Sequence, residues 1–230
     1  MGKENAVCHR YLRRIFVFDS LTDDELAKIA AIVRMKEYKR NTVIFREGEE
    51  GEGLFFVIKG KIKLSKLSEE GKEKILHFCS EGDVFAEILL FDGGVYPATA
   101  ETLENSEIGL IRHADMERVL YENSGITVKF LKVMAKRLRE AQFHIRDLAF
   151  KDAYSRLAST LLNLSAEYGR QTAGADYVGI SLNQQELANV IGTSRETVAR
   201  IIGDWRRDGI IAVHKKEIII KDKKKLAAWL

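Results

Sequence analysis

Hydrophobic residues near the amino terminus repeat with the period of a helix. Leu26, Ile29 and Val33 are spaced so that they fall on one helical face. Thr22 and Glu25 stand just before this stripe with the spacing of a capping box, in which each side chain bonds the backbone of the other residue. The sequence therefore predicts a short helix that begins directly after Thr22.

Between residues 41 and 111 the pattern changes to short hydrophobic runs that are separated by glycines. Ile62 and Leu64 alternate with lysines, which is typical of a strand with one buried face. Residues 69–72 have the composition of a hairpin turn. We therefore expect an antiparallel barrel or sandwich. Its clearest strands are 42–45, 54–58, 61–67 and 74–78.

A long helix is predicted from about Asn123 onward. Its hydrophobic residues are separated alternately by three and four positions, which is the heptad spacing of a coiled coil. The alternative is packing against the chain's own barrel, but such a helix usually has a broader apolar face. We therefore favour a parallel homodimer. The expected dimer seam consists of Leu131, Met134, Leu138, Ala141, Ile145 and Leu148.

A further helix is expected after the long one. Asp152 is suited to be its N-cap, its leucines share one face, and Gly169 permits it to end. The polar residues 170–176 that follow predict a linker.

Residues 183–201 have the pattern of a helix-turn-helix. Ala188 is small where two helices must cross closely, and Gly192, four residues on, permits the turn. A tight helix pair without nucleic acid is the alternative. The residues that supply the buried contacts are Leu187, Ile191, Val198 and Ile201.

The second helix of this pair carries candidate base contacts. Thr193 is expected to cap it, which places Arg195, Glu196 and Arg200 in the first two turns. Arginine binds guanine through two hydrogen bonds, and a carboxylate accepts one from cytosine. Glu196 can instead complete a capping box with Thr193, and Arg200 can form an ion pair with Glu196. Arg195 has no such local alternative and is the first candidate for a base contact.

Residues 211–220 predict a wing, which is a hairpin of two short strands with a turn at 214–216. Lys215 and Lys216 at its tip can contact phosphates, although exposed lysines are common in turns. The further candidates for phosphate contacts are Ser181, Gln184, Gln185 and Arg206.

Basic residues outnumber acidic residues only in the carboxyl-terminal part of the chain. The 230-residue chain has a net charge of +3, and residues 152–230 carry 12 basic against 9 acidic side chains, so the whole excess lies there and favours an anionic partner.

Cys8 and Cys79 are far apart, which excludes a four-thiolate zinc or iron–sulfur site within one chain. No hydrophobic stretch approaches a membrane span and no signal segment begins the chain, so we expect a cytoplasmic protein without membrane contact.

Enzymatic motifs are missing from the sequence. The five histidines form no HxH or HxxxH pattern, and neither GxSxG nor a P-loop occurs, so we expect no catalytic residues and no metal site. A cupin-type metal enzyme is the alternative from another class, because a small barrel can also hold a metal. A regulatory module without nucleic acid would leave the helix-turn-helix pattern unexplained.

Several segments resemble the Crp/Fnr family of catabolite-activator-like bacterial transcription regulators. The resemblance implies a homodimer in which a sensor domain acts through a long helix on winged helix-turn-helix domains bound to double-stranded DNA. It implies that Arg195, Glu196 and Arg200 read a palindromic, TGTGA-like site, and that an activator of this kind would contact RNA polymerase. The segments that carry it are 42–48, 54–60, 82–87, 148–152 and 194–200, the last of which begins with Ser194 as a further candidate DNA contact.

The expected fold class is therefore α+β in three parts. Residues 1–122 form an N-terminal antiparallel β-roll, a jelly roll like that of cyclic-nucleotide-binding domains. Residues 123–149 form the dimerisation helix, and residues 150–230 form the C-terminal winged helix-turn-helix.

The resemblance also implies a pocket for a small-molecule effector. Glu87 matches the ribose-binding glutamate of cyclic-AMP-binding members, but their phosphate-binding arginine and serine fall on Pro97 and Ala98. A buried phosphate without donors is costly, so we expect an effector other than cyclic AMP. Alternatively, Glu87 pairs with Lys136 or Arg137. The pocket candidates are Phe85, Ala86, Glu87, Ile88, Tyr96, Pro97, Ala98, Thr99, Arg137, Leu138, Ala141 and Gln142.

A haem-based gas or redox sensor of the same family is the second possibility for the effector. The position at which the family's carbon monoxide sensors carry a histidine falls near Ile88. A lone histidine on a strand, such as His77, is more often packed or solvated than metal-bound. No specific haem motif is present, and the cofactor is left open.

Overall fold

The computed structural model describes residues 11–19, 21–172, 175–178, 181–214 and 217–230, with only the backbone described at 92, 144, 170–172 and 175–177. The chain divides into two compact units. The first contains residues 1–66 and 76–138, and the second contains residues 67–75 and 139–230.

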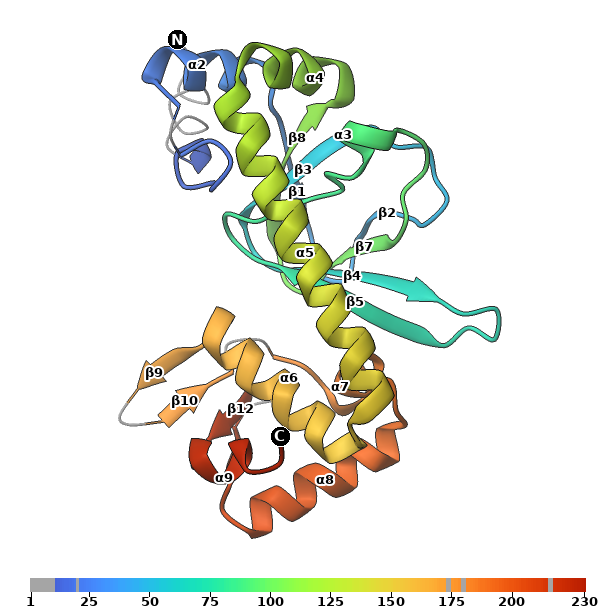
Figure 1. Cartoon of the computed structure of the whole chain (residues 1–230). Coiled ribbons are helices and arrows are strands. Elements are labelled where there is room, and N and C mark those ends of the chain that lie inside the picture. Colours follow the sequence, from blue (N-terminus) through green and yellow to red (C-terminus); the bar gives the residue numbers. More distant parts are fainter. Residues whose placement is uncertain (1–10, 20, 173–174, 179–180, 215–216) are drawn as a thin grey trace. The chain divides into compact units, whose positions relative to one another are not determined.

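Two four-stranded antiparallel sheets form the roll, as the alternating pattern predicts (Figure 1). Their strand orders are β1-β8-β3-β6 and β2-β7-β4-β5. Close packing inside the roll requires a glycine at position 109, because a Cβ there would lie 2.1 Å from the ring of Phe56. The strands are β1 (Arg34–Tyr38), β2 (Val43–Phe45), β3 (Gly53–Lys59), β4 (Ile62–Leu67), β5 (Glu73–Cys79), β6 (Val84–Phe85), β7 (Thr99–Thr102) and β8 (Ser106–Arg112).

Helices cover one side of the roll (Figure 1). The predicted capping box is confirmed: the Thr22 hydroxyl accepts a hydrogen bond from the Glu25 backbone, and the Glu25 carboxylate accepts one from the Thr22 N–H at 2.8 Å. Leu26, Phe56 and Phe130 belong to the core between these helices and the roll. The helices are α2 (Asp23–Ile32), α3 (Leu89–Asp92), α4 (His113–Glu122) and α5 (Ser124–Phe150).

A separate aromatic core occupies part of the space between the two sheets. Phe45, Phe55, Phe85 and Tyr96 lie in it, and the rings of Phe45 and Tyr96 stack with centroids 3.7 Å apart.

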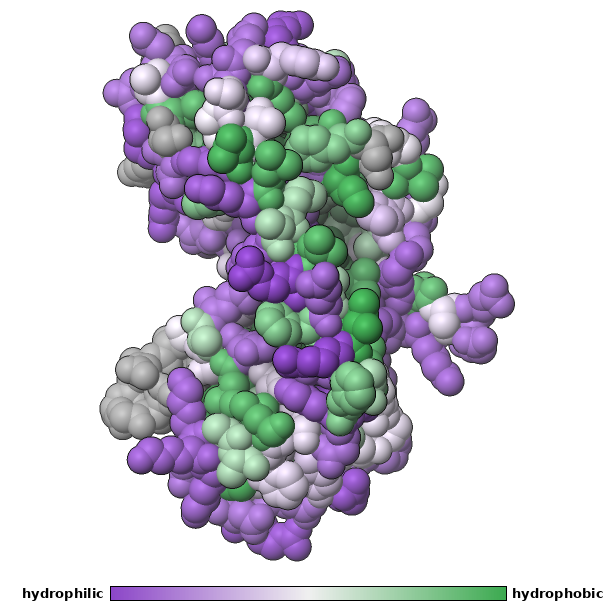
Figure 2. Space-filling model, in the orientation of Figure 1, coloured by the Kyte–Doolittle hydropathy of each residue, from purple (hydrophilic) through white to green (hydrophobic). Residues whose placement is uncertain are grey.

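The long helix α5 starts one residue after the predicted position and has 27 residues. Phe130 on its first half is buried, whereas the seam residues Leu131, Leu138 and Ile145 are 58%, 63% and 68% exposed. Figure 2 shows apolar side chains at the surface along the course of this helix. Of the helices that the structure describes, none is both long and apolar enough to cross a membrane.

The second unit is built from a helical core and one sheet of order β11-β12-β10-β9. Asp152 is the N-cap of α6, as predicted, and accepts a hydrogen bond from the Ser155 N–H at 2.8 Å. The prediction of a linker at 170–176 is wrong, because β9 and β10 form a hairpin that pairs with β12. The elements are α6 (Ala153–Tyr168), β9 (Arg170–Thr172), β10 (Ala175–Tyr177), α7 (Gln184–Ile191), α8 (Arg195–Arg207), β11 (Ile211–His214), β12 (Glu217–Ile220) and α9 (Lys223–Ala227).

Candidate functional site

The helix pair α7 and α8 has the geometry that its sequence predicts. Ala188 is completely buried where the helices meet, and its carbonyl accepts hydrogen bonds from the N–H groups of Gly192 and Thr193. Gly192 adopts the left-handed conformation with φ of 68°, which glycine reaches without steric cost. Leu187, Ile191, Val198 and Ile201 are buried, so their predicted burial is confirmed.

The predicted cap of α8 is wrong by one residue. Ser194, rather than Thr193, is the N-cap, and its hydroxyl accepts a hydrogen bond from the Thr197 N–H. Glu196 therefore does not complete a capping box with Thr193. The pKa of Glu196 is lowered, most strongly by a hydrogen bond from its own backbone and less strongly by one from the Ser194 hydroxyl, so the carboxylate is ionised. It is available as a hydrogen-bond acceptor at the exposed start of α8.

Several of the predicted DNA contacts lie around one depression of the second unit. Its volume is about 520 Å³, and it lies between the start of α7, one face of α8 and the wing strands. Arg195 and Arg206 contribute its positive charge, and Gln184 and Gln185 contribute amides from α7. Ser181 is exposed, and Lys215 and Lys216 lie outside the described residues. The structure thus brings four predicted contacts together at one surface.

Arg200 has a partner that the sequence analysis missed. Its guanidinium donates a hydrogen bond to the Tyr154 hydroxyl at 2.8 Å and lies 5.3 Å from the centre of that ring, instead of pairing with Glu196. The Tyr154 hydroxyl donates in turn to Asp204 at 2.6 Å. Its pKa is raised, chiefly by the bond to Asp204, so the phenol keeps its proton. Tyr154 thereby orients Arg200 on the exposed side of α8.

Local sequence signals cannot reveal this arrangement. Tyr154 and Arg200 are 46 positions apart, and only the packing of α6 against α8 brings them together. The one available signal is a tyrosine two residues after a helix cap, which by itself indicates no partner.

We expect Tyr154→Phe to weaken binding to a specific DNA site about three- to tenfold. The substitution keeps the ring stacked on Trp229 and removes only the hydroxyl that holds Arg200. Ordering a long side chain on binding costs roughly 0.5–1.5 kcal/mol. Because the Tyr154 hydroxyl already orders Arg200 in the free protein, DNA binding does not have to supply this free energy. Fluorescence anisotropy with specific and unrelated duplexes measures the effect. Equal losses on both duplexes would contradict an orienting role, and Tyr168→Phe on the same helix is the matched control.

In the first unit, Glu87 forms a buried ion pair with α5. Its carboxylate lies 2.8 Å from the Arg137 guanidinium, which also donates to the Val84 carbonyl at 2.6 Å. The expected structural alternative for Glu87, a pairing with Arg137, is therefore present. Burial raises the pKa of Glu87, against the opposing effect of Arg137, and also raises the pKa of the fully buried Cys79 thiol nearby.

One oxygen of Glu87 is unusual. Its Oε2 is buried, in a residue that is only 3% exposed, and has no hydrogen-bond partner among the described residues. Ala86, directly before it, has a positive φ of 58°, which costs an L-residue roughly 1–2 kcal/mol. Unsatisfied buried acceptors and backbone strain are both features that cluster at ligand sites.

The other residues predicted for the effector pocket differ in their surroundings. Pro97 is exposed and Ala98 is buried, and neither side chain can donate a hydrogen bond to a phosphate. Phe85 and Tyr96 are buried in the aromatic core, Ile88 and Leu138 are exposed, and Thr99 is half-buried. Ala141 and Gln142 belong to the second unit and are exposed. The described residues contain no cluster of three or more histidine, cysteine, aspartate or glutamate side chains that could hold a metal ion.

Comparisons with known proteins match both units. Residues 35–123 match the model of the cyclic nucleotide-binding domain, and residues 155–229 match that of the Crp-like helix-turn-helix domain. A CRP-like cAMP-activated global transcriptional regulator of Mycobacterium tuberculosis is 31% identical over 94% of this chain and 96% of its own length. The anaerobic regulatory protein of Bacillus subtilis is 32% identical over 90% of this chain and 87% of its own.

Solved structures show the same fold. FixK2 from Bradyrhizobium japonicum superposes with a TM-score of 0.76 at 23% identity and covers 86% of this chain and 97% of its own. TTHA1359, a CRP/FNR-family transcriptional regulator from Thermus thermophilus, has a TM-score of 0.69 at 26% identity, over 85% of this chain and 97% of its own.

Proposed function

The chain belongs to the Crp/Fnr family of DNA-binding transcription regulators, and from this premise we propose that two copies bind one palindromic, TGTGA-like DNA site. The start of α8 carries the proposal: Arg195 and Glu196 are exposed there, while Val198 and Trp205 on its other face are completely buried. In a helix-turn-helix, the amino-terminal part of the second helix meets the base edges. Arg195 then binds guanine, Glu196 accepts from cytosine, and Arg200 reads a further base.

Three functional parts follow from this proposal. Residues 1–122 sense the effector, residues 123–149 pair two copies, and residues 150–230 bind DNA. Pairing through α5 sets the distance between two copies of α8, which must be about one turn of DNA. A change in helix pairing near Glu87 would be passed on through residues 150–152, and a coupling free energy of roughly 1–3 kcal/mol suffices for a 5- to 150-fold change in affinity.

We expect Leu138→Glu to convert the dimer to a monomer and to abolish tight binding to the palindrome. Leu138 is 63% exposed in the single chain, so the substitution leaves the protomer's fold intact and places two carboxylates opposite each other in the proposed seam. Analytical ultracentrifugation measures the assembly, and anisotropy measures DNA binding. Lys132→Glu, also exposed on α5 but outside the seam, is the control. A Leu138→Glu protein that remains dimeric would refute this seam.

The effector in this proposal donates a hydrogen bond to Oε2 of Glu87 and is not cyclic AMP. Buried acceptors without partners are costly, so a ligand that supplies a donor gains affinity there. The names of the relatives differ in this respect, since one is cAMP-activated and another is an anaerobic regulator.

We expect millimolar cyclic AMP to leave the melting temperature unchanged, because Pro97 and Ala98 offer the phosphate no side-chain donor. A true effector raises the melting temperature of the wild type by mass action and does so less with Glu87→Gln. A panel of small metabolites in a thermal shift assay, preceded by a visible absorption spectrum to detect haem, makes this measurement. A clear shift with cyclic AMP would contradict the effector assignment and leave the DNA-binding proposal intact.

A further inference from the structure

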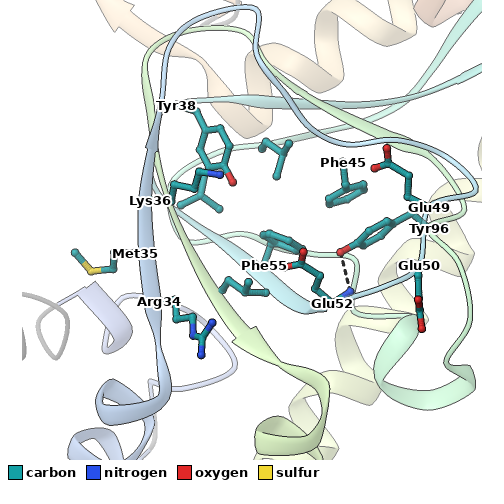
Figure 3. A pocket seen from close by; sticks show the side chains of 13 residues that line it. Arg34, Met35, Lys36, Tyr38, Phe45, Glu49, Glu50, Glu52, Phe55 and Tyr96 are labelled. Carbon is teal, nitrogen blue, oxygen red and sulfur yellow. Dashed lines mark hydrogen bonds between the residues drawn. The ribbon is translucent and has the colours of Figure 1, made fainter.

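A second cavity lies in the first unit, between the two sheets of the roll. Its volume is about 420 Å³, within the usual range of small-molecule sites. Strands β1, β2, β3 and β8 and the segment before β7 supply its walls (Figure 3). Of the residues predicted for the effector pocket, only Tyr96 lines it. Neither the DNA-binding surface nor the Glu87 site accounts for this cavity.

The floor of the cavity is aromatic and already packed. Phe45 and Tyr96 stack within 10° of parallel, and Phe55 lies 5.2 Å from Phe45 between ring centroids. All three rings are at most 6% exposed. The Tyr96 hydroxyl accepts a hydrogen bond from the Glu52 N–H at 2.9 Å, which holds the ring in place. These contacts fix the position of the floor.

Charged side chains of opposite sign line the two sides of the rim (Figure 3). Arg34 and Lys36 come from β1, and the Lys36 ammonium lies 5.0 Å from the centre of the Tyr38 ring. On the other side, the segment between β2 and β3 supplies Glu49, Glu50 and Glu52.

Of these carboxylates, Glu52 is best placed to meet a ligand. In Figure 3 its carboxylate points toward the aromatic rings, whereas Glu50 points away from them. Glu49 is engaged in its own turn, where it accepts a hydrogen bond from the Arg46 N–H at 2.7 Å. Burial, with Glu52 and Glu49 nearby, raises the pKa of Tyr96, so its phenol stays protonated and can also donate to a ligand.

We propose that this cavity binds a small zwitterion with a large apolar side chain, that is, an aromatic or branched α-amino acid. Lys36 binds its carboxylate, Glu52 binds its ammonium group, and the side chain lies against Phe45, Phe55 and Tyr96. A simple anion would bind Lys36 and leave the Glu52 carboxylate without a ligand group, and a simple cation would bind Glu52 and leave Lys36 without one. Only a ligand with both charges matches both sides of the rim.

Three ligands with the same phenyl ring test this match. L-phenylalanine carries both charges, 2-phenylethylamine only the ammonium group, and 3-phenylpropanoate only the carboxylate. Isothermal titration calorimetry of the purified full-length protein is expected to show L-phenylalanine, or L-leucine if the side chain must be branched, binding about tenfold more tightly than either singly charged analogue, since each lost charge-assisted hydrogen bond weakens binding. Equal affinity for the three phenyl compounds, or no binding of either amino acid up to about 10 mM, overturns the proposal.

Substitutions at the rim assign each charge to its partner. Lys36→Met should reduce amino acid binding about tenfold and leave 2-phenylethylamine unchanged, whereas Glu52→Gln should reduce it similarly and leave 3-phenylpropanoate unchanged. Both side chains are exposed, so neither change should disturb folding, which circular dichroism checks. Lys28→Met and Glu117→Gln remove the same charges outside the cavity and should have no effect. If Glu87→Gln abolished amino acid binding and neither rim variant did so, the ligand would bind at the Glu87 site, and the proposed site in the cavity would be refuted. The test does not depend on DNA binding.

Discussion

Arg195→Ala should lower affinity for the preferred palindrome by about 1–3 kcal/mol per site, or roughly 5- to 150-fold, while binding to unrelated duplex DNA is almost unchanged. Arg195 is the exposed first residue of α8 and lines the depression beside α7 and the wing. An arginine that forms two hydrogen bonds to guanine contributes discrimination of this size, whereas non-specific binding depends mainly on phosphate contacts. Fluorescence anisotropy at one fixed salt concentration, with the palindrome and with a scrambled duplex, measures both quantities.

Arg206→Ala provides the contrast on the same surface. Arg206 lies in the last turn of α8 and is a candidate phosphate contact, so its loss should weaken binding to both duplexes equally and reduce the salt dependence. If Arg195→Ala behaved in the same way as Arg206→Ala, Arg195 would be a phosphate contact and the proposed base reading would fall.

Arg137→Met should lower the free energy of unfolding of the sensor unit by about 3 kcal/mol. The substitution leaves the carboxylate of Glu87, whose side chain is 4% exposed, without its charged partner. Breaking a buried ion pair costs roughly 3–5 kcal/mol, and the lower end applies here because the Arg137 side chain is 26% exposed. Urea denaturation measures the change. The double variant Glu87→Gln/Arg137→Met removes the charge as well and should recover much of the loss; an equal loss in both variants would show that packing alone is responsible.

The pH dependence of unfolding distinguishes these explanations further. Burial raises the pKa of Glu87 above that in the unfolded chain, so the native state binds the proton more tightly. Its contribution to stability is therefore largest below the ordinary glutamate pKa of about 4.3 and decreases as pH rises through the native value. Without Arg137 the native pKa rises further, so the deficit of Arg137→Met should shrink as pH falls from 7.5 toward 5. The double variant should show no such change.

The cap of α8 illustrates how far local patterns reach. Thr193 and Ser194 are both good N-cap residues, and the sequence does not distinguish them. The Thr193 N–H still bonds the Ala188 carbonyl at the end of α7, so the turn extends through Thr193 and the helix begins after Ser194. A one-residue difference of this kind depends on how the two helices meet.

The hairpin of β9 and β10 illustrates a tertiary effect. Residues 170–176 are polar and alternate poorly, so they resemble a linker. Pairing of Asp176 and Tyr177 with Ile220 and Ile219 on β12 makes β10 an inner strand of the wing sheet, with β9 at its edge. Pairing between strands that are more than 40 positions apart in the sequence overrides the weak local preference of these residues for a loop.

Periodicity and capping residues in the sequence determined the helices α2, α5, α6, α7 and α8 and the strands β2 to β5, because these signals act between residues a few positions apart. They did not reveal β9 and β10. They suffice for the caps at Thr22 and Asp152, for the turn at Gly192 and for the heptads of α5. The partners of Glu87 and Arg200 and the cavity between the sheets arise from side chains that meet only after distant segments pack. Tyr38, Phe45, Phe55 and Tyr96 line one cavity from four parts of the chain, and no local spacing encodes that encounter.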